Sequence, residues 1–575
     1  MSNEPTTPTP VLKPQDDTIK ETFESIVIAF ILAFVFRAYV VEAFVIPTGS
    51  MAPTLLGEHM RVNCDQCGYH FKVETPSPPD KTFGVPADGR KILADITYRC
   101  PMCRHDQLMP KLSQISSGDR ILVHKYLYSI NEPQRWDVVV FKAPHKPQIN
   151  YIKRLIGLPS QDTMILEGNI YYNASPGDES KWQIARKTDP QENRHAEKVQ
   201  RVAWQPIHHT QYVPLDFPTV DRWRSPWVIE SPKDATASAW KRIDESSSEL
   251  DPRGGIEFKT ADASAMRFAF PRVYDGRTAG FFPYGQGFND QMRAPMVPVE
   301  DVRIAAAIEA KQAGFEVNLQ TTARLDDKTG TTHALTLTID AAGNATLSRS
   351  DVPTPIETVN IGAFEPGITR LVEFWYVDQE ASLWIDGKRV LVKQFDDIQY
   401  VDLMKRPMAF VKFENAMMAQ QHEMRDDNGR QSNLSVPVVK VNFKGSPVTF
   451  HRIELDRDLY YTATGDMYRP GKGVIIKNED ASTLFGEPAH LKADEFFCLG
   501  DNSPFSSDGR AWVTVDPWVL ARSFADGTSE EHSHGIVPRR LMMGKAFFVY
   551  FPSLIGSSPQ ATPMFPDFGE MRLIR

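Results

Sequence analysis

The chain has 575 residues, several times the length of a typical domain of about 150 residues, so we expect two to four domains. Hydrophobic residues make up 41% and charged residues 24%, which excludes a wholly disordered chain and a protein with many membrane spans. The net charge of −9 argues against a general nucleic-acid binder, and five cysteines are too few for a disulfide scaffold.

A polar start precedes a long apolar run. Residues 1–21 include a stretch rich in Pro and Thr, and we expect a flexible tail there. Ile26–Ile46 is the most apolar stretch of the chain, and a membrane-spanning helix needs about 20 apolar residues. We therefore predict one transmembrane helix over 22–45, with Arg37 reaching towards an interface. A buried core helix is the alternative, and the absence of a framed cleavage site disfavours a cleavable signal peptide.

Two cysteine pairs lie within residues 61–106. Cys64 and Cys67 form one CxxC pair, and Cys100 and Cys103 form the other. Four thiolates at these spacings suit tetrahedral Zn²⁺ without an open position. We therefore expect a zinc-ribbon-like insertion with a structural Zn²⁺; a disulfide pair or idle thiols are the alternative, because oxidising conditions prevail outside the membrane.

Strand patterns dominate the remainder and predict a mainly β fold. Short β-branched runs between 117 and 165 alternate with turn signals, as in a β-rich domain. We assign 46–172 to the first part of a catalytic domain and 460–575 to its second part, where apolar strand-like segments return. The two parts are separated by an insertion.

The insertion, residues 173–459, is predicted to be a β-sandwich. A hairpin with an Ala-Ala-Gly-Asn turn follows an alternating strand at 333–340. Another pair of hairpins has its turns at 378–379 and 386–387. Strands at such spacing are typical of a sandwich or jelly roll.

A serine and a lysine are the candidates for chemistry. Ser50 lies on a tight turn directly after Pro47, which ends any helix. Lys153 lies in an apolar strand and faces the same side as Tyr151 and Leu155. A free lysine is neutral in only about one molecule in 2,500 at pH 7, but burial lowers its pKa by up to about 3–5 units. A buried Lys153 can take the proton of a serine hydroxyl, although each residue alone also has an ordinary structural explanation.

The loop from Leu499 to Trp512 is dense in turn formers and charges. Asp501, Asp508 and Arg510 can form a network that fixes the loop, although an ordinary surface loop has a similar composition. Cys498, just before it, is expected to be a buried core residue.

Six sequence blocks in a fixed order resemble type I signal peptidases, the membrane-anchored Ser-Lys enzymes that remove signal peptides from exported proteins. The blocks are IPTGSMAPTL, SGDRILVHKYLY, RWDVVVFKAP, NYIKRLIGLP, GDNSPFSSDGRAW and GIVPRRLMMGKAFFVYFP. Each block alone is modest, but six in this order are specific. The matching parts cover about 21–56, 117–172 and 460–552.

The resemblance implies a role for each matched residue and no cofactor for catalysis. Ser50 is expected to attack the scissile carbonyl and form an acyl-enzyme, with Lys153 as the general base. The Ser50 N–H and the Thr48 hydroxyl are expected to form the oxyanion hole, where one donor is worth roughly 3–4 kcal/mol of barrier. The supporting residues are Ser506, which would hydrogen-bond the lysine, Asp508 and Arg510, which would form a salt bridge, and Asp501, which would brace the loop.

The family prefers small side chains in an Ala-X-Ala pattern, which shallow apolar pockets select. The matching positions are Ile46, Pro47, Met51, Leu55, Tyr151 and Ile152. The substrate is expected to add a strand beside Gln148 to Ile152. The implied partners are preprotein signal peptides, membrane lipid and the secretion machinery, with no nucleic acid. The implied location is the cytoplasmic membrane, crossed once, with the catalytic domain on the extracytoplasmic side.

The sequence departs from the family at several places. The family's Gly-Asp after the lysine block is replaced by Ser160-Gln161-Asp162, so a longer turn is expected there. The stretch between Trp512 and Gly535 is also longer than in the family, and we expect its histidines to be solvated rather than metal ligands.

The large insertion loosely resembles laminin-G or concanavalin-like jelly rolls in two stretches, without a sugar- or calcium-binding pattern. We expect no catalysis there, but substrate docking, partner binding or steric cover. Two other functions compete with the peptidase. A repressor-type Ser-Lys autoprotease is disfavoured by the apolar segment beside Ser50. A membrane-anchored binding protein on a decayed peptidase scaffold is disfavoured by the intact Ser50 and Lys153.

Overall fold

The structure is a computed structural model, and strands dominate it, which confirms the predicted mainly β fold. The described residues are 18–63, 70–74, 97–99, 106–108, 115–166, 168–187, 205–209, 227–230, 240–242, 256–258, 264–268, 274–275, 297–324, 332–395, 438–461, 488–503, 506–512, 514–520, 535–552, 554–555 and 565–574. The four cysteines of the predicted zinc ribbon, Cys64, Cys67, Cys100 and Cys103, lie outside these residues, so the zinc site stays a prediction.

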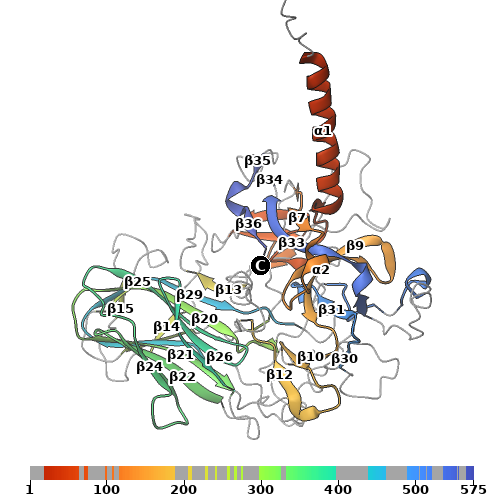
Figure 1. Cartoon of the computed structure of the whole chain (residues 1–575). Coiled ribbons are helices and arrows are strands. Elements are labelled where there is room, and N and C mark those ends of the chain that lie inside the picture. Colours follow the sequence, from red (N-terminus) through yellow and green to blue (C-terminus); the bar gives the residue numbers. More distant parts are fainter. Residues whose placement is uncertain are drawn as a thin grey trace, which may run out of the picture.

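The N-terminal helix projects from the rest of the chain (Figure 1). Helix α1 spans Thr18–Tyr39, so it begins before the predicted start at Thr22. Large apolar side chains along it are exposed, among them Phe30 and Phe34. Within the part of the chain that the structure describes, no helix has both the length and the apolar character needed to cross a membrane. The predicted span therefore stays a prediction.

The last residues of the predicted span form a strand instead. β1, Val41–Val45, pairs antiparallel with β7, Arg120–His124. The boundary predicted at residue 45 was therefore wrong, because Val-Glu-Ala-Phe-Val satisfies its backbone hydrogen bonds across a sheet rather than within a helix.

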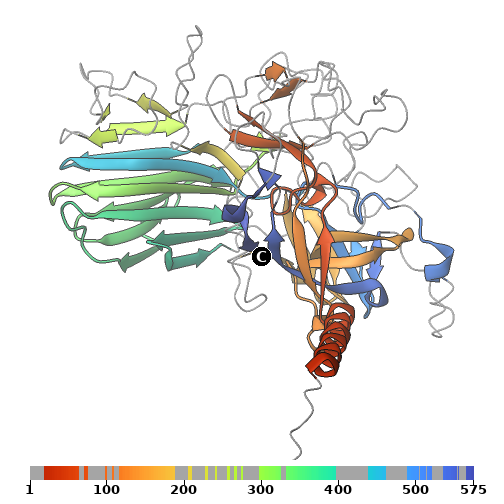
Figure 2. The same ribbon diagram turned by 90° about the horizontal axis from the view of Figure 1, so that it is seen from above.

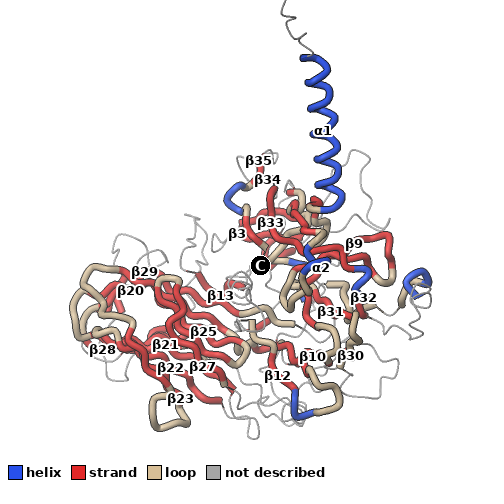
Figure 3. Tube along the Cα trace, viewed as in Figure 1, coloured by secondary structure: helices blue, strands red, loops and turns tan. Residues whose placement is uncertain are grey.

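The sheet that carries the candidate site is antiparallel and has the order β1-β7-β33-β8-β9-β31-β32, with β36 added beside β33. Figure 3 shows these strands below the end of α1. The remaining bounds are β8 Val138–Ala143, β9 Lys146–Gly157, β31 Glu495–Leu499, β32 Ile536–Pro538, β33 Met542–Phe551 and β36 Arg572–Leu573.

A small sheet with the order β12-β11-β10-β30 lies next to it along the chain. The bounds are β10 Asp162–Leu166, β11 Asn169–Asn173, β12 Trp182–Ile184 and β30 Ala489–His490. β12 lies beyond the predicted boundary at residue 173 and still pairs with β11. β30, which follows the insertion in the sequence, pairs with β10. Both ends of the insertion therefore meet at this sheet.

Within the insertion, two antiparallel sheets bury one shared apolar cluster between them, and Figure 2 shows their strands beside the rest of the chain. One has the order β15-β16-β29-β20-β25-β26-β27, with β13 beside β29; the other has the order β14-β17-β28-β21-β22-β23-β24. The first sheet consists of β13 Gln205–His209, β15 Trp240–Arg242, β16 Ile256–Phe258, β20 Val302–Ala310, β25 Thr369–Val377, β26 Glu380–Ile385, β27 Lys388–Gln394 and β29 Val448–Arg457. The second consists of β14 Trp227–Glu230, β17 Ser264–Phe268, β21 Phe315–Arg324, β22 Thr332–Asp340, β23 Asn344–Arg349, β24 Glu357–Asn360 and β28 Lys440–Gly445.

The alternation in the sequence explains the core of this sandwich. Leu335, Leu337 and Ile339 of β22 are buried in one apolar cluster with residues of the facing sheet, as alternation predicts. The tight turn between β25 and β26 has Asp378 at φ 50° and Gln379 at φ 57°, which is the left-handed geometry of two-residue hairpin turns. The predicted hairpins are confirmed.

The remaining elements are short. They are α2 Leu127–Ile130, β2 His59–Asn63, β3 His70–Glu74, β4 Thr97–Arg99, β5 Asp106–Leu108, β6 Ile115–Ser116, β18 Tyr274–Asp275, β19 Val297–Pro298, β34 Leu554–Ile555 and β35 Phe565–Pro566, with 3-10 turns at Gly49–Met51, Glu179–Lys181, Arg539–Leu541 and Phe568–Glu570.

Candidate active site

Ser50 lies on a turn that the chain forms as it leaves β1. The N–H of Ile46 donates to the Asp119 carbonyl at 2.9 Å, which extends the pairing of β1 beyond Val45. The 3-10 turn Gly49–Met51 follows, preceded by Thr48 in an extended conformation. A Cβ on Gly57 would come within 2.3 Å of the Thr48 carbonyl carbon, so only glycine allows this close approach. Two backbone contacts therefore fix where the turn sits.

The Ser50 hydroxyl and the Lys153 amine are in contact. Lys153 lies on β9, opposite Val139 of β8, and its Nζ is 2.7 Å from Ser50 Oγ. The side chain is buried, with 4% of the residue exposed. Burial is the main reason that the pKa of Lys153 falls to about 8. At pH 7 about one amine in ten is then neutral, which makes this lysine a far better base than a free one.

Aromatic rings form one wall beside the lysine. The Tyr151 ring centroid is 5.4 Å from Lys153 Nζ. Behind Tyr151, the rings of His145 and Trp512 lie at centroid distances of 5.6 and 5.7 Å from it. This wall keeps water from one side of the amine and so contributes to its desolvation.

Asp508 and Arg510 form the predicted ion pair. Their side chains are fully buried, and Arg510 Nη2 is 2.6 Å from Asp508 Oδ2. Asp508 also accepts from the Gly500 N–H at 3.0 Å, and Arg510 donates to Ser503 Oγ at 2.6 Å. Burial alone would raise the pKa of Asp508, but the charge and hydrogen bonds of Arg510 hold that pKa below its usual value. The pair ties both ends of the loop together.

Ser506 does not make the hydrogen bond that the sequence predicts. Its Oγ is buried and has no hydrogen-bond partner among the described residues, so the expected bond to Lys153 is not formed. The hydroxyl does lie close to the site, because a Cβ on Gly500 would be 2.2 Å from Ser506 Oγ and 2.4 Å from the Ser50 carbonyl oxygen.

Asp501 has a partner that sequence reasoning missed. Arg154 follows Lys153 on β9 and points to the other face of the strand. Its guanidinium binds Asp501 in a bidentate ion pair, with Nε at 2.7 Å from Oδ1 and Nη2 at 2.6 Å from Oδ2, both side chains fully buried. Thr54 Oγ1 donates to Asp501 Oδ2 at 2.5 Å. The available signal was an arginine directly before the apolar Leu155 and Ile156, because a buried guanidinium needs a carboxylate.

Asn502 holds the serine turn directly and was also missed. Its backbone N–H donates to the Ser50 carbonyl at 3.1 Å, and its side-chain amide donates to the Gly49 carbonyl at 3.0 Å. Asp501 and Asn502 together therefore link the loop after β31 to the turn that carries the hydroxyl.

The residues predicted to bind substrate fall into two groups. Ile46, Met51 and Leu55 are buried in an apolar cluster, and Met51 and Leu55 have 0% exposure. They offer a substrate almost no surface, so lining a pocket is not supported for these three. Pro47 and Gln148 are exposed, and Tyr151 and Ile152 are half-buried. Contact with substrate stays a prediction for the second group.

The turn after the lysine block connects β9 to β10, and its length relative to the family stays a prediction. β9 ends at Gly157 and β10 begins at Asp162. Ser160, between them, has φ 59°, a conformation that favours glycine, and its N–H donates to the Lys492 carbonyl at 3.1 Å. Cys498 is buried as predicted, and burial raises the pKa of its thiol well above the usual value.

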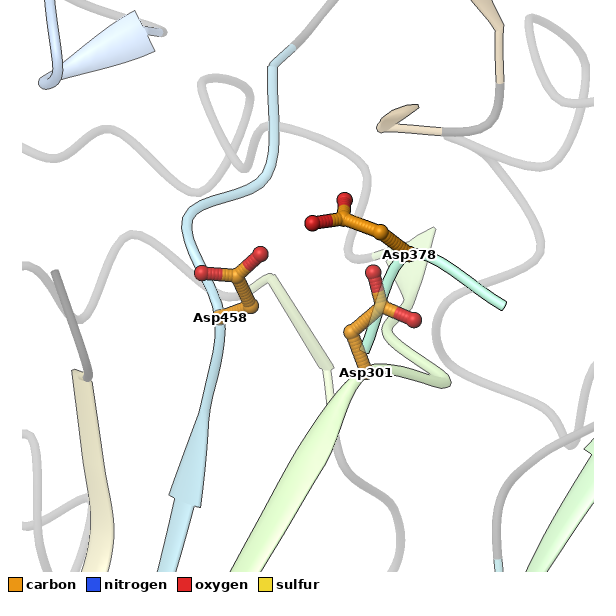
Figure 4. Close-up of side chains that lie close together, drawn as sticks. All are labelled: Asp301, Asp378 and Asp458. Carbon is orange, nitrogen blue, oxygen red and sulfur yellow. The ribbon is translucent and has the colours of Figure 1, made fainter. Parts of the chain in front are cut away.

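A second charged cluster lies at the junction with the insertion. Asp301, Asp378 and Asp458 are buried and bring their carboxylates within 4.8 Å of one another, facing inwards (Figure 4). Lys187 supplies a cation to them, with Nζ 2.9 Å from Asp378 Oδ1 and 2.6 Å from Asp458 Oδ2. We call these four residues the Lys187 cluster. An ammonium already fills the role that a metal ion would have there.

Comparison with known proteins concerns mainly the part of the chain around this site. The family model for signal peptidase, peptidase S26, matches residues 19–80 and 108–217. The matched regions are similar to signal peptidases. Signal peptidase I of Rickettsia bellii is 26% identical over 156 residues, which cover 27% of this chain and 40% of that protein. Signal peptidase I of Pseudomonas aeruginosa is 42% identical over 69 residues, covering 10% of this chain and 24% of that protein.

The chain thus spans less than half the length of these relatives. The regions that carry Ser50 and Lys153 are therefore similar to signal peptidases of the S26 type. The solved structures to which the chain is similar include a carbohydrate-binding module from Bacillus subtilis. That match has 7% sequence identity and a TM-score of 0.22, and it covers 40% of this chain and 96% of that chain. The catalytic domain of an endo-1,3-beta-glucanase from Thermotoga petrophila has 10% identity, a TM-score of 0.24 and coverage of 44% and 98%. Likeness this low carries no argument about the insertion.

Proposed function

We propose that the chain is a serine endopeptidase that removes signal peptides from exported preproteins, with Ser50 as nucleophile and Lys153 as general base. The observation that carries the proposal is the 2.7 Å contact between Ser50 Oγ and a buried Lys153 whose pKa is lowered to about 8. A hydroxyl beside a desolvated amine is an activated nucleophile. The similarity of residues 19–80 and 108–217 to the S26 family supports the same activity.

The proposed reaction proceeds in two steps. Neutral Lys153 takes the Ser50 proton while Oγ attacks the scissile carbonyl, and the oxyanion is stabilised by the Ser50 N–H and the Thr48 hydroxyl. Lys153 then gives that proton to the leaving amine, and an acyl-enzyme remains. Water, deprotonated by the same amine, hydrolyses the ester and restores Ser50. The exposed Thr48 makes no capping hydrogen bond to the 3-10 turn, which supports a hydroxyl kept for substrate.

The substrate is proposed to bind as an extended strand beside Gln148 to Ile152. Among the described strands, β31 pairs with β9 only from Arg154 to Gly157, and residues 148–150 are exposed, so no described strand occupies this edge before Lys153. Small residues in an Ala-X-Ala pattern would suit the half-buried surface of Tyr151 and Ile152. The exposed apolar side chains of α1, which leads through β1 to Ser50, support a membrane anchor. The location that we propose from the resemblance is the cytoplasmic membrane, with the site on its outer side.

Preprotein cleavage by the purified chain tests this proposal. Wild type should release the signal peptide, and Ser50→Ala and Lys153→Met should each lower the rate by about 10⁴-fold or more, because nucleophile and base act as a unit. Lys142→Met is the matched control, since Lys142 is exposed on the neighbouring strand β8 and should leave the rate unchanged. Retained cleavage in either active-site variant would reject the mechanism. A wild type that cleaves no preprotein would favour a binding protein on a peptidase scaffold.

A further inference from the structure

The inserted sandwich ends shortly before a tyrosine that reaches the active site. β29 ends at Arg457, and Tyr461 follows after a short connection. Its side chain is buried in an apolar cluster that the small sheet shares with the sheet of the candidate site, and its N–H donates to the Gly168 carbonyl at 3.2 Å. Packing and backbone pairing therefore hold the ring in place.

The hydroxyl of Tyr461 contacts the carboxylate beside the catalytic loop. Tyr461 OH lies 3.2 Å from Asp501 Oδ1, which also accepts from Arg154 Nε at 2.7 Å. Asp501 is followed by Asn502, whose N–H donates to the Ser50 carbonyl at 3.1 Å. A displacement of Asp501 is thus passed on to the nucleophile through adjacent backbone.

The Lys187 cluster holds together the two points where the chain enters and leaves the sandwich. Lys187 follows β12 on the way in, and Asp458 follows β29 on the way out. The Lys187 ammonium binds Asp458 and also Asp378 of the β25–β26 turn, and the Asp458 N–H donates to the Asp301 carbonyl at 3.0 Å. The connection to Tyr461 therefore starts from a fixed point.

The same turn of the sandwich makes further contacts with the peptidase-like part. Gln379 Nε2 donates to the Tyr171 hydroxyl of β11 at 3.0 Å. Arg186 donates to the Asp378 carbonyl at 3.2 Å and to the Phe395 carbonyl at 3.3 Å. These hydrogen bonds resist rotation of the sandwich about its two connections, so the sandwich is fixed to the peptidase-like part by more than the two connecting segments.

We propose that Tyr461 is a positioning residue of the active site, and that the sandwich, held by the Lys187 cluster, delivers it to Asp501. This inference rests on the proposed peptidase function. Tyr461 does not touch the reacting atoms; it fixes the carboxylate that, with Asn502, sets the distance between Ser50 and Lys153. The insertion is then part of the catalytic apparatus in addition to whatever it binds.

The test compares Tyr461→Phe with Tyr172→Phe in the full chain. Tyr172 is the matched control, because its hydroxyl bonds to Gln183 in the same small sheet, away from Asp501. Steady-state cleavage of a signal-peptide substrate is measured from pH 6 to 10, well below the melting temperature of each variant. We expect Tyr461→Phe to lower kcat by about 5- to 20-fold at every pH, with KM within about twofold of wild type, because a misplaced catalytic group costs rate rather than binding. Tyr172→Phe should keep wild-type kcat.

Three results would overturn the inference: a Tyr461→Phe kcat within twofold of wild type, an equal loss in Tyr172→Phe, or a loss that vanishes at high pH. The last would mean that the hydroxyl acts on the protonation of Lys153 and not on position. Absence of cleavage by wild type would instead reject the proposed function itself, so the two failures are distinguishable.

Discussion

The peptidase-like sheet and the inserted sandwich are both antiparallel, yet they bury different side chains. Near Ser50 the interior contains Lys153 and two buried ion pairs, Arg154–Asp501 and Arg510–Asp508. Between the sheets of the sandwich, the core is a large apolar cluster. Burying a charged group costs stability, so such groups are retained where chemistry or positioning requires them. An apolar core, by contrast, stabilises the fold through the apolar surface that it removes from water. The charges buried beside Ser50 therefore indicate a function, whereas the apolar core between the two sandwich sheets indicates a fold.

The junction between the two regions also buries charge, in the Lys187 cluster. We expect the largest effect of a substitution on stability there. Lys187→Met would leave three buried carboxylates without their cation and cost about 3–5 kcal/mol of unfolding free energy at neutral pH. Lys444→Met is the control, because Lys444 pairs with Glu316 at 3.0 Å on the surface and should cost less than about 1 kcal/mol. Urea denaturation measures both.

The sign of the pH effect sharpens this prediction. Burial already raises the pKa of Asp458 to about 6 in the wild type, and burial likewise raises the pKa of Asp301. Carboxylates with raised folded pKa values bind protons more readily in the folded state, so the variant should lose less stability at pH 5 than at pH 8. An unchanged loss across this range would contradict the assignment of charge to the cluster.

The next effect concerns the close packing around Ser50. Gly500→Ala would place a Cβ 2.4 Å from the Ser50 carbonyl oxygen, so the serine turn must move. We expect kcat to fall by about 100-fold, the cost of misplacing a catalytic group by roughly 1 Å. Gly569→Ala is the control, since its Cβ would meet only Asp567 Oδ1 at 3.6 Å. Equal activity of the two variants would show that the turn tolerates displacement.

A smaller effect is expected on stability when Lys153 is replaced, and it has the opposite sign to the effect on activity. The pKa of Lys153 is lowered in the folded state, so the unfolded chain binds more protons between pH 8 and 10.5, and wild-type stability rises with pH across that window. Lys153→Met has no such penalty and should be more stable at pH 7 by about 2 kcal/mol, after allowing about 1 kcal/mol for the lost hydrogen bond to Ser50. Thermal unfolding at pH 7 and pH 10 measures it. A destabilised variant at pH 7 would mean that burial does not lower the pKa of Lys153.

Sequence reasoning found the residues that carry local patterns. Ser50 and Lys153 were predicted from ordered sequence blocks, and β22 and the Asp378-Gln379 turn from alternation and turn chemistry. The end of the apolar run was predicted as helix, because its apolar composition does not reveal that β7 would pair with it.

Long-range pairs were beyond the sequence for a physical reason. Asp501 lies 347 residues after Arg154, and Asp378 lies 191 residues after Lys187. Neither spacing has a period that a strand or helix imposes, so only the folded chain brings these charges together. Ser506 shows the reverse case, since a residue can match a family position and still lack the hydrogen bond that the family implies.

The dependence of kcat/KM on pH tests the central claim most directly. If neutral Lys153 is the base, kcat/KM for a signal-peptide substrate should rise about tenfold per pH unit below pH 8 and level off above it, with a midpoint near the pKa of about 8. A rise centred near 10.5, the ordinary lysine value, or a rate independent of pH between 6 and 10, would contradict an uncharged amine at Ser50.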